Sequence, residues 1–194
     1  LVKKNLFREY NLINKIKDKF PLSRENAISI ILKNLDPQSL IVSTTGMISR
    51  EVFEYRSNNK EGHFRDFLTV GSMGHSSSIS LGLALSCKSR KIICLDGDGS
   101  MIMHLGATAI QGDMGLDNFL HIILNNAAHD SVGGQPTVAQ QINIPEIAKN
   151  CGYKNVVKIC DISSLIETID KFKKYPTGPN LIEVLVSKGA RNDL

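Results

Sequence analysis

The chain has 194 residues, of which 42% are hydrophobic and 22% charged, an ordinary composition for one globular domain. A net charge of +4, no Trp and no basic stripe interleaved with aromatics argue against nucleic-acid binding. No apolar run approaches the roughly 18 residues of a membrane span, and no signal peptide is visible. The four cysteines lack the spacing of a zinc site and suit a reducing compartment, so we predict a cytoplasmic protein.

The first part of the chain differs from the rest. In residues 1–20 basic and apolar positions alternate without a clean helical or strand period, and the chain does not begin with Met. We predict that they form a linker or arm following a preceding domain, and that residues 21–194 form one domain. Pro21 and Ser23 open a predicted helix, which Ser23 can cap.

Six short apolar segments after Pro37 are typical of strands, at residues 40–42, 67–70, 91–95, 119–124, 156–159 and 181–186. Helices are predicted between several of them, at residues 77–85, 101–110 and 163–172. This alternation predicts an α/β fold with a doubly wound, mostly parallel sheet of about six strands and helices on both faces. Such sheets bind ligands beyond the carboxyl ends of their strands.

Small and polar residues cluster at four of these strand ends, at residues 43–46, 71–74, 96–100 and 125–126. In the third cluster, Gly97 and Gly99 allow close backbone approach to a ligand. The start of the following helix favours an anion, and Ser100 can donate a hydrogen bond to phosphate. Asp98 would repel a bare phosphate, so a hard cation such as Mg²⁺ is expected between them.

Two other motifs are excluded for this segment. An EF-hand loop starting at Asp96 would need Gly and Glu where Met101 and Ala107 stand. The third glycine of the Rossmann fingerprint is missing. Taken alone, the segment also fits a plain strand-to-helix turn.

The asparagine pair at residues 125–126 strengthens the prediction of a site. The 25 residues from Ser100 to Leu124 are the length of one helix and one strand, as a crossover to a neighbouring parallel strand requires. Asn126 is therefore expected to face Asp98 and to offer its amide oxygen to the cation.

The spacing G-D-G…N-N resembles the signature of the thiamine-diphosphate-dependent enzymes. The resemblance implies that Mg²⁺ is bound by Asp98, Asn126 and the backbone carbonyl of Ala128. It also implies that Met73, in a G-S-M-G turn, wedges under thiamine diphosphate, and that the Gly71 carbonyl accepts from its aminopyrimidine. The cofactor-binding residues that it implies are Thr45, Gly46, Gly71, Ser72, Met73, Gly97, Gly99, Ser100 and Ser131.

Within these enzymes, residues 43–51, 71–75 and 125–137 closely resemble the phosphonopyruvate decarboxylases, which convert 3-phosphonopyruvate to phosphonoacetaldehyde and CO2. The same segments are similar to the beta subunit of sulfopyruvate decarboxylase, which acts on a sulfonate. A phosphonate and a sulfonate are both tetrahedral oxyanions, so the choice of substrate stays open. Cationic candidates for holding that anion are Arg50, His75, His129 and Arg191.

In this family a Glu on a separate pyrimidine-binding domain activates the cofactor, and no Glu of this chain matches it. We therefore predict that the chain alone is not a complete catalyst, that its catalytic Glu lies on a partner domain, fused or separate, and that the assembly is a homo-oligomer. Other hypotheses are a non-catalytic thiamine-diphosphate-binding subunit and a magnesium-dependent phosphate-binding protein. A 2-oxoacid:ferredoxin oxidoreductase subunit is less favoured, because the cysteines show no iron–sulfur pattern.

Overall fold

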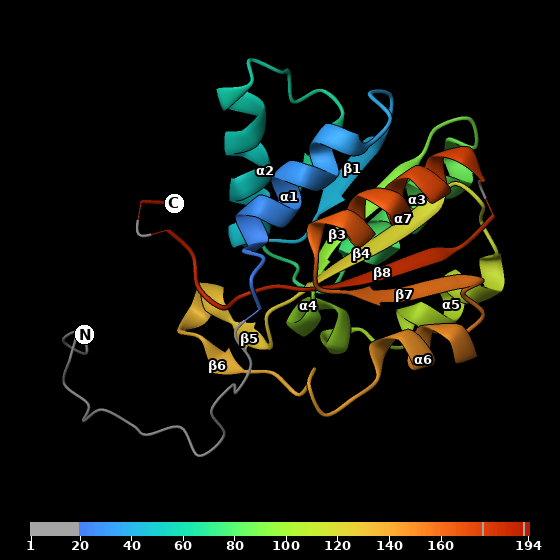
Figure 1. The fold of residues 1–194 in the computed structure, drawn as a ribbon. Coiled ribbons are helices and arrows are strands. Elements are labelled where there is room, and N and C mark those ends of the chain that lie inside the picture. Colours follow the sequence, from blue (N-terminus) through green and yellow to red (C-terminus); the bar gives the residue numbers. More distant parts are fainter. Residues whose placement is uncertain (1–19, 176, 192) are drawn as a thin grey trace.

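A computed structural model describes residues 20–175, 177–191 and 193–194 (Figure 1). The arm predicted over residues 1–20 lies, apart from Phe20, outside the described residues. Within the described part of the chain, no helix combines the length and apolarity that crossing a membrane requires.

The centre of the fold is a six-stranded sheet in the order β2-β1-β3-β4-β8-β7, in which every neighbouring pair is parallel. This confirms the predicted parallel sheet. The strands are β1 (Leu40–Ser43), β2 (Asp66–Leu68), β3 (Ile92–Gly97), β4 (Phe119–Asn125), β7 (Asn155–Ile159) and β8 (Asn180–Leu185). The chain winds outward in opposite directions from β1 and β3, so the switch point that favours ligand binding lies between these two strands.

Helices cover both faces of the sheet (Figure 1). One apolar core joins the sheet to α1 (Arg24–Asn34), α2 (Met47–Asn58) and α7 (Ile162–Lys174). The helices of the other face are α3 (Ser76–Ser86), α4 (Asp98–Met103), α5 (Ala107–Met114) and α6 (Ile144–Asn150). Side chains of β3 alternate between the cores, with Ile93 and Leu95 in the first and Ile92 and Cys94 in the second, because successive residues of a strand point to opposite faces.

Several elements differ from the prediction. The helix predicted over residues 101–110 is two helices, α4 and α5, which a turn at residues 104–106 separates. β2 ends at Leu68, before Val70, which is 96% exposed. Elements that were not predicted are α2, α6, the short 3-10 helix η1 (Asp130–Val132) and the antiparallel pair β5 (Ala128–His129) and β6 (Gln135–Pro136).

Candidate active site

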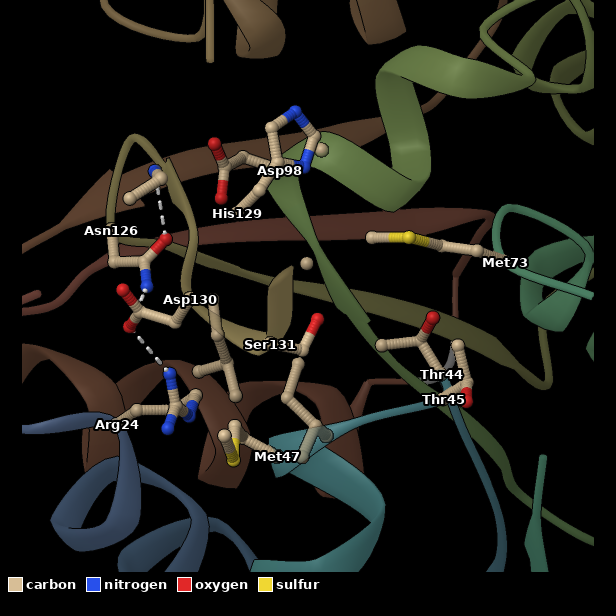
Figure 2. A pocket seen from close by; sticks show the side chains of 15 residues that line it. Arg24, Thr44, Thr45, Met47, Met73, Asp98, Asn126, His129, Asp130 and Ser131 are labelled. Carbon is tan, nitrogen blue, oxygen red and sulfur yellow. Dashed lines mark hydrogen bonds and ion pairs between the residues drawn. The ribbon is translucent and has the colours of Figure 1, made fainter. Parts of the chain in front are cut away.

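A small pocket opens at the carboxyl ends of β1, β3 and β4, where the sequence predicts a site (Figure 2). Its volume is about 50 Å³, far below the roughly 300–1,000 Å³ of pockets that enclose a whole ligand. By itself, a pocket of this volume does not enclose a whole ligand. A larger hollow of about 730 Å³ lies beside the amino ends of β7 and β8, away from the polar clusters.

The pocket brings together most of the predicted site residues. Those that line it are Thr45, Met73, Gly97, Asp98, Gly99, Asn126, Ala128, His129 and Ser131. The predicted residues outside its lining are Gly46, Arg50, Gly71, Ser72, His75, Ser100 and Arg191. The sequence reasoning missed six lining residues, which are Arg24, Thr44, Met47, Ile48, Leu124 and Asp130.

Ser100 lies behind the pocket and joins three of the strand-end clusters. It is fully buried, and its Oγ shares a hydrogen bond of 2.9 Å with Thr44 Oγ1. The backbone N–H of Gly74 donates to the same Oγ at 3.0 Å. In this structure the Ser100 hydroxyl thus joins the end of β1 and the turn before α3 to the start of α4, and Ser100 is not among the residues that line the pocket.

The turn at residues 71–74 has an unusual backbone. Gly71, Ser72 and Gly74 all have positive φ, of 78°, 47° and 91°, a region that costs an L-residue such as serine of the order of 1–2 kcal/mol. Thr45 Oγ1 accepts from the Gly71 N–H at 3.1 Å and so fixes the turn to the end of β1. The turn places Met73 in the pocket wall.

Asp98 is the buried carboxylate of the pocket, with 2% of its surface exposed. It is the first residue of α4, and the hydroxyl of Thr137 donates to its Oδ2. Burial raises the pKa of Asp98 to about 6, although the Thr137 hydrogen bond opposes the shift. A nearby cation would favour the charged form of this carboxylate.

Asn126 follows β4 and lines the same wall, with 7% of the residue exposed. Its Oδ1 accepts from the Ala128 N–H at 3.0 Å. The intervening Ala127 has a φ of 55°, which reverses the chain sharply after the strand.

The other residue of the asparagine pair has a structural role. Asn125 donates through Nδ2 to the fully buried Glu183 at 2.6 Å, and its Oδ1 accepts from the Ala127 N–H at 2.9 Å. Asn125 therefore anchors the loop to β8, while Asn126 faces the pocket.

The residues present fit a magnesium ion and a diphosphate. The wall offers a carboxylate from Asp98, an amide oxygen from Asn126 and the backbone of Ala128, and oxygen ligands of this kind suit Mg²⁺. A Cβ at Gly99 would lie 2.5 Å from Cε1 of His129, so a larger residue there would displace the histidine ring. Without a side chain at Gly99, the loop after β3 and the loop after β4 can approach one another.

Thr137→Val is expected to weaken magnesium-dependent binding of thiamine diphosphate about tenfold, since outer-shell partners of metal ligands typically contribute factors of 10–100. Valine keeps the shape of threonine but removes the hydroxyl that fixes Asp98. Titrating Mg²⁺ at fixed cofactor concentration measures the effect. An unchanged midpoint would show that Thr137 does not orient the carboxylate.

The two histidine candidates for the substrate anion lie in different places. His129 is half-buried in the pocket wall. His75 is exposed at the start of α3, and its ring packs on His104 with the centroids 4.2 Å apart. Of the two, only His129 contributes to the pocket of the described chain.

The two arginine candidates are exposed and lie outside the pocket lining. Arg50, on α2, donates to the backbone oxygen of Leu194 at 3.4 Å. Arg191 pairs with three carboxylates, those of Glu25, Glu54 and Asp193, so its charge is compensated within the chain. Their predicted contact with a substrate remains a prediction.

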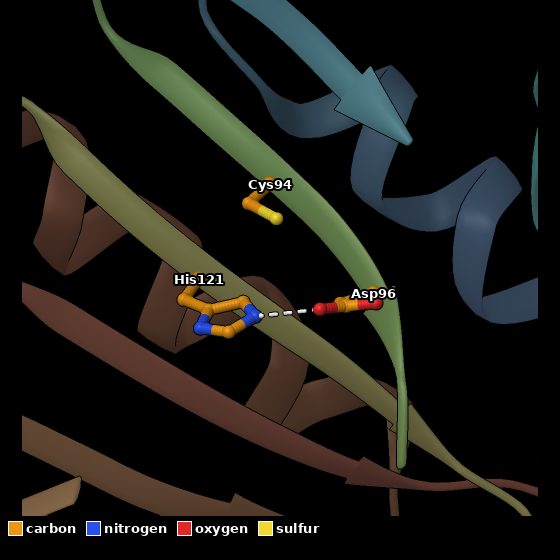
Figure 3. A group of neighbouring side chains, drawn as sticks. All are labelled: Cys94, Asp96 and His121. Carbon is orange, nitrogen blue, oxygen red and sulfur yellow. Dashed lines mark hydrogen bonds and ion pairs between the residues drawn. The ribbon is translucent and has the colours of Figure 1, made fainter. Parts of the chain in front are cut away.

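A second polar group lies inside the core that faces α3 and α6 (Figure 3). The Cys94 sulfur, a carboxylate oxygen of Asp96 and a ring nitrogen of His121 lie within 4.8 Å of one another, and all three residues are buried. Asp96 Oδ2 is 3.2 Å from His121 Nε2, and its Oδ1 accepts from the Gly97 N–H at 2.9 Å. Hydrogen bonds thus account for the burial of Asp96, and they fix the turn that leads to Asp98.

Comparison with known proteins identifies the family of the chain. Residues 44–184 match the family described as "Thiamine pyrophosphate enzyme, C-terminal TPP binding domain". Among solved structures, the chain resembles the benzoylformate decarboxylase from Polynucleobacter necessarius with a TM-score of 0.72 and 17% identity. That match covers 88% of this chain and 34% of the other, and at this identity it shows the fold alone.

Curated relatives are more similar in sequence. The chain is 34% identical to a phosphonopyruvate decarboxylase of Streptomyces viridochromogenes over 89% of this chain and 42% of that protein, so it spans less than half of that relative. It is 36% identical to the sulfopyruvate decarboxylase subunit beta of Methanocaldococcus jannaschii over 85% of this chain and 82% of that subunit. The chain therefore belongs to the thiamine pyrophosphate enzymes, as a member of their C-terminal TPP-binding domain family.

Proposed function

We propose that this chain is the diphosphate- and magnesium-binding half of a decarboxylase that converts 3-phosphonopyruvate to phosphonoacetaldehyde and CO2. The observation that carries the proposal is the meeting of Asp98, Asn126 and Ala128 in one pocket wall opposite Met73. The similarity to phosphonopyruvate decarboxylases over 89% of the chain supports the substrate.

In the proposed site, Asp98, the amide oxygen of Asn126 and the carbonyl of Ala128 would hold Mg²⁺. The backbone of Gly97 and Gly99 would bind the diphosphate, and Met73 would support the body of the cofactor. When bound, thiamine diphosphate supplies the electron sink that makes loss of CO2 possible. The protein residues fix its position and exclude water from one side of it.

The proposal includes a partner domain that binds the pyrimidine end of the cofactor. None of the fifteen residues that line the pocket in the described part of the chain is a glutamate, so the activating Glu is assigned to the partner. The pocket volume of about 50 Å³ is likewise consistent with a site completed by a second domain, fused or separate, within a homo-oligomer.

The alternative substrate is sulfopyruvate, with this chain as the beta subunit. The match to the Methanocaldococcus jannaschii subunit, at 36% identity over 82% of that subunit, supports this alternative. Both substrates carry a tetrahedral oxyanion, and His129 is the one predicted anion-binding side chain among the described residues that line the pocket.

The assembled protein, with its pyrimidine-binding partner, is the material for the test. We expect calorimetry to show thiamine diphosphate binding in Mg²⁺ and little binding in EDTA. We then expect 3-phosphonopyruvate to yield CO2 and phosphonoacetaldehyde faster than sulfopyruvate yields sulfoacetaldehyde. Faster turnover of sulfopyruvate would identify the sulfonate as the substrate. Cofactor binding without decarboxylation of either acid would indicate a non-catalytic subunit, and equal affinity for pyrophosphate would contradict the thiamine site.

A further inference from the structure

The side-chain amide of Asn126 has two ends of similar shape and opposite polarity, because its oxygen accepts hydrogen bonds and its nitrogen donates them. A magnesium ligand must present the oxygen. A contact that fixes this orientation in advance would spare the metal the cost of turning the amide.

Asp130 sets that orientation (Figure 2). Its Oδ2 accepts from Asn126 Nδ2 at 2.6 Å, while Asn126 Oδ1 accepts from the Ala128 N–H at 3.0 Å. A flipped amide would place its oxygen against the Asp130 carboxylate and its nitrogen against an N–H donor. Both contacts would be repulsive, so one orientation is strongly favoured.

Asp130 is itself held by two other donors on the same oxygen. Arg24 Nη1 donates to Oδ2 at 3.1 Å, and the Gly189 N–H donates at 2.9 Å. The Asp130 side chain is 9% exposed. Three donors from distant parts of the chain thus converge on one carboxylate oxygen.

Arg24 is the least expected member of this group. It is the first residue of α1, where the helix dipole disfavours a cation, and it is only 4% exposed. Glu51 compensates with two hydrogen bonds of 2.9 Å to Nε and Nη2. Burial alone would lower the pKa of Arg24, but its bonds to Glu51 and Asp130 leave the pKa raised, so it stays charged.

We propose that Asp130 is a positioning residue that holds the Asn126 amide with its oxygen available to a divalent cation, and that Arg24, fixed by Glu51, holds Asp130 in turn. This inference rests on the proposed function, in which Asn126 is a magnesium ligand. Asp130 touches neither cofactor nor substrate in this assignment and acts only through Asn126.

The test is a Mg²⁺ titration of thiamine diphosphate binding to the assembled protein. Asp130→Ala is expected to raise the Mg²⁺ concentration at half-saturation about tenfold or more, the range typical of outer-shell partners. Asp130→Asn, which keeps the shape but removes the charge, is expected to shift it in the same direction by less. The matched control is Asp170→Ala, which removes the carboxylate of an exposed ion pair with Lys173 on α7 and is expected to leave the midpoint unchanged.

A double-mutant cycle separates positioning from general structural damage. If Asp130 acts through Asn126, Asp130→Ala causes no further loss of Mg²⁺ affinity in an Asn126→Ala background. The same fold-loss in both backgrounds, or an unchanged midpoint for Asp130→Ala alone, overturns the inference and leaves the proposed function intact. Wild-type binding that ignores EDTA would instead overturn the proposed function, and the inference with it.

Discussion

Asp98→Asn is expected to abolish magnesium-dependent binding of thiamine diphosphate. The neutral amide keeps the volume of the side chain and can still accept from Thr137, but it removes the only carboxylate besides Asp130 among the described lining residues. The loss should exceed the roughly 10–100-fold that an outer-shell substitution costs. Calorimetric titration with Mg²⁺ and with EDTA measures it, and a variant that binds as tightly as wild type would refute the metal site.

The same variant is expected to be more stable than the wild type when no metal is present. The pKa of Asp98 is about 6 in the folded chain against 3.8 for the free group, so wild-type stability falls as pH rises through this window. Above pH 6 this pKa difference lowers the free energy of unfolding of the wild type by about 3 kcal/mol. Below about pH 4 this loss is absent. Urea unfolding in EDTA at pH 7.5 and at pH 4 tests this. A less stable variant at pH 7.5 would contradict it.

Gly112→Ala is expected to destabilise the fold by more than about 3 kcal/mol, the upper end of ordinary overpacking. Gly112 lies in α5, and a Cβ there would fall 1.7 Å from the backbone oxygen of Cys151. Backbone cannot rotate away as a side chain can, so α5 and the end of α6 would have to separate. Denaturant unfolding measures the loss.

Gly82 offers the matched control for this substitution. It lies within α3, and a Cβ there would meet nothing within 4 Å. Gly82→Ala is expected to stabilise the protein by about 0.5–1 kcal/mol, because alanine loses less backbone entropy in a helix. Similar effects of the two substitutions on stability would contradict the close approach of Gly112 to Cys151.

The sheet, and the edge at which the candidate site lies, could be predicted from the sequence because both depend on local patterns. Each central strand is an apolar run that ends in glycine or a small polar residue, and the strand ends of a parallel sheet meet at one edge. The helix at residues 47–58 was harder to predict. Its N-cap is Gly46, which has a φ of 96° and provides no side-chain cap, so the Ser, Thr, Asp or Asn that usually signals a helix start is missing.

Contacts between distant residues escaped prediction. Arg24 and Asp130 are 106 positions apart, and no periodicity relates them, so a basic residue at the start of α1 reads as surface charge. For Ser100, the sequence motif could be recognised but the contacts of the side chain could not. Its place in the motif predicts a ligand contact, which stays a prediction. The hydrogen bonds of its hydroxyl to Thr44 and Gly74 could not be predicted, because only the folded chain brings these residues together.

The strand order has a consequence for how the chain is made. β8, which follows the other described strands along the sequence, lies inside the sheet between β4 and β7. All seven residues of β4 are buried in the finished fold. One edge of β4 stays unpaired until the ribosome has released residues 180–185. Such edges pair readily with other chains, so we expect nascent chains that stall before β8 to aggregate or to depend on chaperones.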